Sequence, residues 1–254
     1  MKKSCCIAVL CILFSAQAVC AHEMALLPQL WQRYFKGQEV PVAVCSTHIF
    51  GISDALENPD GVRLLYNGQR VELVKNTIWR TCDGLVTLAE EGTAIIEALR
   101  AAQVRSELDM GWVVGGRDAY PNAKNSVNFE KYAKLLLPVG GKMDGYNRFL
   151  GHRLEIVPVD NPFAARIGDE LRFIVLLDGK PAYIDEVRAT YNGFSNITGA
   201  WAWRSDPSAH GEATIRITHA GIWNVNVDVE VPAVSRQFEK ENIRAVLTFP
   251  VNGL

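Results

Sequence analysis

His22 is the residue best placed to do chemistry, because signal cleavage after Ala21 would make it the first residue of the mature chain. An α-amino group and an imidazole on one residue chelate a transition metal through two nitrogens, which suit copper, nickel, cobalt and zinc. His48 could add a third nitrogen if the two segments lie side by side, and Glu23 or Met24 could complete the sphere. Three nitrogens with an open position favour nickel or copper over magnesium or calcium. The alternative is a histidine left by chance at a flexible end.

Residues 1–21 have the pattern of a secretory signal peptide. Two lysines precede an apolar run from Cys5 to Phe14, and the small-residue sequence Val19-Cys20-Ala21 follows. Lipidation of Cys20 is the alternative, although Gln17, three positions ahead of it, is not aliphatic and Val19, just before it, is not a small residue. The sequence therefore predicts export through a cleaved signal.

The composition of the mature chain excludes several classes of protein. Two of the 26 basic residues leave with the signal, so 24 remain against 28 acidic residues, a formal charge of −4. Nucleic-acid binding needs a basic patch, which this balance does not favour. After the signal there is no run of about 18 apolar residues, so we expect no transmembrane segment in the mature chain.

Two cysteines remain once the signal is removed, Cys45 and Cys82. A pair of cysteines in an exported chain predicts one disulfide, which would stabilise the fold by about 3 to 4 kcal/mol. A thiolate metal site that includes His48 is the alternative.

The elements that must position these residues are mainly β-strands. Asn67-Gly68 lies between two alternating runs and predicts a hairpin. Short β-rich runs separated by turns continue to the end of the chain and predict an antiparallel sandwich. The expected strands are 40–45, 62–66, 69–74, 170–177, 186–191, 212–218, 222–231 and 244–251.

The stretch from 85 to 110 is ambiguous, and residues 94–104 favour a short helix by propensity. Residues 129–139 suit either a strand or a helix. The length allows two domains, and we predict an N-terminal β-rich domain over 22–145 and a C-terminal β-sandwich over 146–254.

Several motifs, in this order, resemble a Gram-negative periplasmic family of unknown function that is catalogued as the periplasmic component of an ABC-type cobalt or nickel transport system. They are Leu154–Phe163 (LEIVPVDNPF), Leu177–Pro181 (LDGKP), the turn Tyr191-Asn192-Gly193, Ala220–Trp223 (AGIW) and Arg244–Phe249 (RAVLTF).

The front of the chain is similar to the same family, whose members often mature to a histidine and then run to a proline, here His22 to Pro28. His48-Ile49-Phe50 partly matches a histidine and aromatic found in nickel-linked relatives. The resemblance implies a periplasmic protein with an immunoglobulin-like C-terminal domain that delivers a divalent metal to an inner-membrane transporter.

A recognition module is the alternative function. Trp201 and Trp203 are separated by one residue, so in a strand they share a side and could stack on a glycan or a protein partner. Burial in the core is the other reading for both. Since no catalytic motif is present, we expect a protein that is not an enzyme, with a copper oxidative site at His22 as the one catalytic alternative. His152, His210 and His219 are expected at exposed edges or in turns.

Overall fold

Three β-sheets make up the protein in a computed structural model that describes residues 22–29 and 33–252. The predicted signal peptide lies outside these residues. The mainly β prediction is confirmed, since the only helical turns in the described part are the 3-10 segments η1 (Pro59–Gly61) and η2 (Pro162–Ala164).

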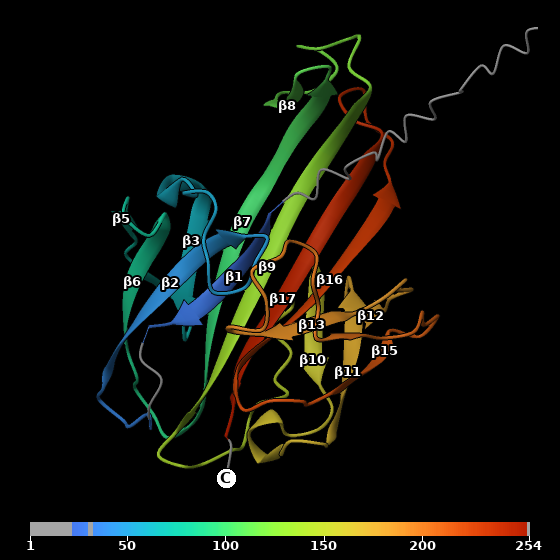
Figure 1. Cartoon of the computed structure of the whole chain (residues 1–254). Helices are drawn as coiled ribbons and strands as arrows, with labels where there is room; N and C mark the ends of the chain where they lie inside the picture. The colour runs from blue at the N-terminus through green and yellow to red at the C-terminus, as the bar shows by residue number, and fades with distance from the viewer. Residues whose placement is uncertain (1–21, 30–32, 253–254) are drawn as a thin grey trace, which may run out of the picture.

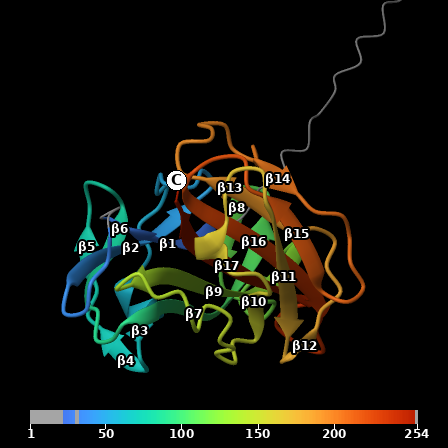
Figure 2. The ribbon, with the colours of Figure 1, turned by 90° about the horizontal axis from the view of Figure 1, so that it is seen from below.

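A central sheet extends through the described part of the protein (Figures 1 and 2). Two small sheets, one from the N-terminal and one from the C-terminal half of the chain, pack against its opposite faces. The N-terminal small sheet contains, in spatial order, β1 (Glu23–Pro28), β2 (Glu39–Thr47), β6 (Thr81–Thr87) and β5 (Val74–Asn76). The C-terminal small sheet contains β10 (Leu154–Pro158), β11 (Glu170–Leu177) and β12 (Lys180–Pro181), with β15 (Glu212–Arg216) also paired to β11.

The central sheet has nine strands. In spatial order these are β14 (Trp203–Arg204), β13 (Arg188–Tyr191), β16 (Gly221–Pro232), β17 (Lys240–Val251), β9 (Asn125–Val139), β7 (Gly92–Leu108), β3 (Val62–Tyr66) and β4 (Gln69–Val71), and β8 (Gly111–Val114) pairs with β7. The β17–β9 pair is parallel, whereas all the other strand pairs are antiparallel. The sheet thus crosses the predicted boundary between 145 and 146, and the division into two domains stays a prediction.

Between the two small sheets both faces of the central sheet are buried, which explains the apolar run Leu135–Leu137 in β9. Leu135 and Leu137 belong to a core shared with the N-terminal small sheet, whereas Leu136 belongs to a second core shared with the C-terminal small sheet. Side chains alternate along a strand, so an element buried on both faces must be apolar at consecutive positions.

The predicted helix over 94–104 is wrong, because these residues lie in β7. Ile95 packs in one core and Ile96 in the other, so the segment alternates with the period of a strand. Pairing with β3 on one side and β9 on the other overrides a helix propensity that was only a weak preference. Residues 129–139, which suited either state, are a strand for the same reason.

The predicted Cys45–Cys82 disulfide is also wrong, and both residues are free, buried thiols. In the β2–β6 ladder Cys82 pairs with Val44, so Cys45 is offset by one residue. Successive side chains point to opposite faces, and a bridge between the two cysteines would therefore have to pass through the sheet. Burial, reinforced by Asp83, raises the pKa of Cys45 to about 12, and burial also raises the pKa of Cys82.

We therefore expect neither cysteine to react quickly in the folded protein, since the thiolate is the reactive form. In protein that begins at His22 and is kept free of reductant, a thiol reagent should titrate two thiols after unfolding. The same reagent should titrate none quickly in the folded protein. Added reductant should leave the melting temperature unchanged. A count of zero thiols in denaturant would show that the bridge forms after all.

Candidate metal centre and adjoining cavity

The pairing of β1 with β2 brings His22 beside His48. Glu23 is registered opposite Thr47, so the residues just outside the ladder on each strand, His22 and His48, are neighbours. Their ring centroids lie 4.0 Å apart. A shared metal site requires this pairing, and the structure contains it.

The segment after β2 folds back on itself and delivers a carboxylate to the same place. Thr47 Oγ1 accepts the backbone N–H of Ile49 and donates to the Ile52 carbonyl at 2.5 Å, which closes a tight turn. Gly51 has φ +95°, and a Cβ there would lie 2.2 Å from the side-chain oxygen of Asn192, so only glycine fits. The turn places Asp54 against His48.

His22, His48 and Asp54 form a cluster in which one ligand atom from each residue lies within 4.8 Å of the others. All three are half-buried. An Asp54 oxygen accepts the backbone N–H of His48 at 2.6 Å and lies 3.1 Å from His48 Nδ1. A carboxylate on one ring nitrogen fixes the tautomer and leaves the lone pair on the other nitrogen, as in many histidine metal ligands.

The environment of His22 favours the neutral form of its imidazole. Burial lowers the pKa of His22 below its ordinary value, and the neighbouring His48 and Lys131 lower it further. A neutral imidazole is the form that binds a metal, because protonation occupies the lone pair.

Glu23 and Met24, the other predicted ligands, do not join this cluster. The Glu23 carboxylate accepts a hydrogen bond from Arg244 Nη1 at 3.0 Å and lies 3.7 Å from Arg188 Nη2. Met24 is 1% exposed and packs in the core beneath the N-terminal small sheet. Asp54 takes their place, and sequence reasoning missed it because it lies six residues beyond His48 in a turn with no repeating pattern.

The remaining histidines divide between the surface and the interior. His210 and His219 are exposed, as expected, and His219 stacks on Tyr191. His152 was expected at an exposed edge, but it is buried at 5% exposure, 2.6 Å from Glu97 and stacked on Tyr132.

The two tryptophans of the alternative function are half-buried. Trp203 packs against the C-terminal core, and its indole N–H donates to the Thr214 carbonyl at 3.0 Å. The Arg188 guanidinium lies 5.2 Å from the ring centre of Trp201. Each indole is therefore already engaged within the chain.

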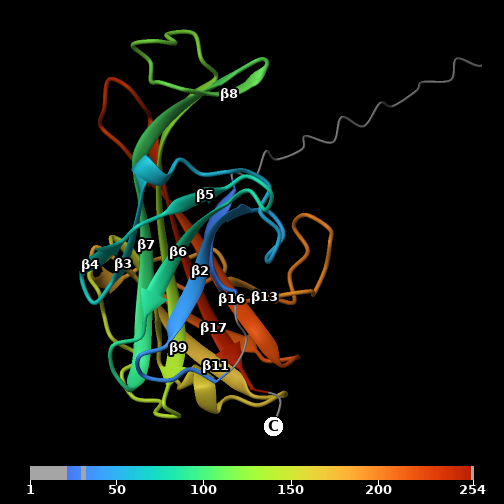
Figure 3. The same ribbon diagram turned by 90° about the vertical axis from the view of Figure 1, so that its left-hand side faces the viewer.

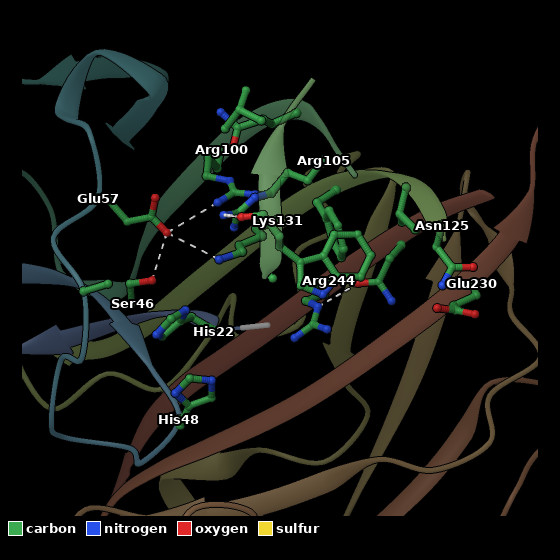
Figure 4. A pocket seen from close by; sticks show the side chains of 18 of the residues that line it. His22, Ser46, His48, Glu57, Arg100, Arg105, Asn125, Lys131, Glu230 and Arg244 are labelled. Atoms are coloured by element: carbon green, nitrogen blue, oxygen red, sulfur yellow. Dashed lines mark hydrogen bonds and ion pairs between the residues drawn. The ribbon is translucent and has the colours of Figure 1, made fainter. Parts of the chain in front are cut away.

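A cavity of about 790 Å³ opens beside the histidines, which lie along one side of it (Figure 4). On the other side, side chains from β7, β9 and β17 form its wall, among them Arg100, Lys131 and Arg244. Glu57 lies between two of these cations, with one oxygen 3.3 Å from Lys131 Nζ and 3.6 Å from an Arg100 nitrogen.

Burial shapes the charges in this wall. It lowers the pKa of Lys131 to about 8, with Arg100 acting in the same direction. Burial alone would raise the pKa of Glu57, but Lys131 and Arg100 together hold it below its usual value. Glu57 is therefore an anion held by its two neighbours.

These features define a mainly β protein with a histidine-carboxylate cluster at the mouth of a basic cavity. The chain belongs to the family described as "Domain of unknown function (DUF4198)", which it matches over residues 19–231. A search of curated proteins found no match. In the described part of the chain, no helix combines the length and apolar character needed to cross a membrane.

Similar solved structures are distant. The D0-D1 domain of Intimin is 12% identical, with 90% of this chain and 98% of that chain covered and a TM-score of 0.22. The human OSCAR ligand-binding domain is also 12% identical, with coverages of 89% and 98% and a TM-score of 0.22. A putative membrane anchored protein from Corynebacterium diphtheriae is 13% identical, with coverages of 92% and 60% and a TM-score of 0.24. Scores this low carry no argument about function.

Proposed function

We propose that this protein binds one divalent transition metal at His22 and His48, with Asp54 as a further ligand or as the carboxylate that orients His48. The observation that carries the proposal is the convergence of these three side chains, from the start of β1 and the turn after β2, within 4.8 Å. Imidazole nitrogens suit nickel, cobalt, copper and zinc.

Cleavage after Ala21 would complete the donor set, because the new α-amino group lies on the same residue as the His22 imidazole. The two imidazoles and the amino group supply three nitrogens, and Asp54 lies against His48 to fix its tautomer. Nickel or cobalt is the leading metal and copper the alternative, since all three accept nitrogen-rich sites.

The role proposed is that of a non-catalytic accessory protein. We place it in the periplasm, reached through the signal at residues 1–21, where it would hold the metal for an inner-membrane transporter. The half-buried position of both imidazoles supports binding that is reversible, since the ligands stay reachable from the cavity.

Calorimetry with nickel, cobalt, copper and zinc tests the proposal on protein exported and cleaved before His22. We expect tight binding of one ion per chain. His48→Ala should weaken the affinity by about tenfold to a hundredfold or more, because even the loss of a residue that only hydrogen-bonds a metal ligand costs this much. Asp54→Asn should weaken binding less than His48→Ala, since the amide keeps an oxygen near His48.

His210→Ala is the matched control, because His210 is an exposed histidine outside the cluster. It should leave the affinity unchanged. Weak binding that neither His22→Ala nor His48→Ala alters would overturn the metal function.

A further inference from the structure

The cavity wall is one face of the central sheet, continued past the edge of the N-terminal small sheet. Lower on this face, Ala133 and Leu135 of β9 and Val246 of β17 pack in the N-terminal core. Figure 3 shows β7 and β9 extending beyond the blue strands toward β8. Beyond the edge of the N-terminal small sheet, most side chains on the same face are charged or amide groups.

Three cross-strand rows form this uncovered part. Each row takes one residue from β7, one from β9 and one from β17, and the residues of a row are direct partners in the ladders. The rows are Arg100, Lys131 and Arg244; Gln103, Phe129 and Asn242; and Arg105, Val127 and Lys240. All nine residues line the cavity.

A β-bulge in β7 is what makes the rows possible. Arg100 pairs with Lys131 and the next registered pair is Gln103 with Phe129, so β7 contains one extra residue there. An extra residue switches the side chains that follow to the other face. Without the bulge Arg105 would point away from the face that holds Arg100, and the bulge therefore places both guanidinium groups on one cavity wall.

The cavity has an excess of positive charge. Its lining contains five cations, Arg100, Arg105, Lys131, Lys240 and Arg244, against the two carboxylates Glu57 and Glu230. Glu23 on β1 pairs with Arg244, so the five cations face three carboxylates and an excess of two positive charges remains. Charges in a recess of low polarity attract counter-charges more strongly than the same charges in water.

Two donors in the wall have no partner among the described residues. The Nε atoms of Arg100 and Arg105 are buried and make no hydrogen bond there. A buried donor without a partner is costly, and a guanidinium matches the geometry of a carboxylate. Beside them Trp112 and Phe129 meet edge to face at 5.6 Å and add an apolar surface.

The volume of about 790 Å³ far exceeds the need of an ion, and it lies in the range of about 300–1,000 Å³ typical of sites for small organic ligands. We propose that the cavity binds a small organic dianion, with its carboxylates against Arg100 and Arg105 and its apolar body against Trp112 and Phe129. This site goes beyond the metal function and does not require the metal to be present.

Calorimetry of phthalate binding to metal-free protein that begins at His22 tests the proposal. We expect saturable binding of one phthalate, and benzoate, which has one carboxylate fewer, should bind about tenfold or more weakly because a charge-assisted contact is lost. Arg105→Gln should weaken phthalate binding by a similar factor in the same measurement.

Lys240→Gln provides a second variant at the rim of the same row and should also weaken phthalate. Arg63→Gln, an exposed arginine on β3, is the matched control and should not. Phthalate binding is measured without metal, so failure of the metal function and failure of this site are separable. The proposal would be overturned if the wild type did not bind phthalate, or if the Arg105 and Lys240 variants bound it as tightly as the wild type.

Discussion

One alanine added before His22 is expected to lower the metal affinity of the processed protein by at least about a hundredfold. Substituting a residue that only hydrogen-bonds a metal ligand costs about tenfold to a hundredfold, and the loss of a ligand itself should cost more. The added residue converts the α-amino group of His22 into an amide, which removes one nitrogen donor. The second donor, the imidazole, stays in place because β1 is held by its ladder with β2. The two proteins should therefore differ in metal binding but not in fold.

The measurement is calorimetry on two purified proteins, one beginning at His22 and one at the added alanine. His48→Ala in each background is the control, because the extension should cost little once the site has already been disrupted. Equal affinities for the two proteins would show that the amino group is not a ligand and would reduce the site to the side chains of His22, His48 and Asp54.

Glu155→Ala is expected to lower the free energy of unfolding by about 3–5 kcal/mol, the cost of breaking a buried ion pair. The Glu155 carboxylate is fully buried and lies 2.8 Å from Lys134 Nζ, which is itself buried. It also accepts the backbone N–H groups of Leu150, Gly151 and His152. Its removal leaves a buried lysine without its ion-pair partner and three backbone N–H groups without their acceptor.

Urea unfolding followed by circular dichroism measures this loss. Glu170→Ala, at an exposed position on β11, is the matched control and should change stability by less than about 0.5 kcal/mol. The double variant Lys134→Met with Glu155→Leu should recover much of the stability, because an apolar pair needs no partner. A single variant as stable as the wild type would show that the pair contributes nothing.

The strands were predictable where local pattern alone decides them. The alternating run at 170–177 is β11, and Asn67-Gly68 is the turn between β3 and β4, with both residues at positive φ. The helix predicted over 94–104 failed because Ala, Leu and Glu favour a helix locally, whereas β3 and β9, distant in sequence, determine the outcome. The parallel β17–β9 pair has no local signature at all.

The site was predictable in part for the same reason. The shared site of His22 and His48 was predicted on the condition that the two segments lie side by side, and the ladder of β1 with β2 meets this condition. Asp54 depends on a turn built by Thr47 and Gly51, which periodicity does not reveal. The cavity was not predictable, because its rows join three strands and depend on a bulge in β7.

The place of β17 also sets the order of events when the protein is made. It is the last strand along the described chain, yet it lies between β16 and β9, and it pairs with residues of β9 that precede it by 113 positions. Until β17 leaves the ribosome, no strand joins β9 to β16, and the two halves of the central sheet stay separate. Contacts between such distant residues also form slowly. A chain whose central sheet stays incomplete until its last strand is made is suited to threading through a translocation channel, as the proposed export requires.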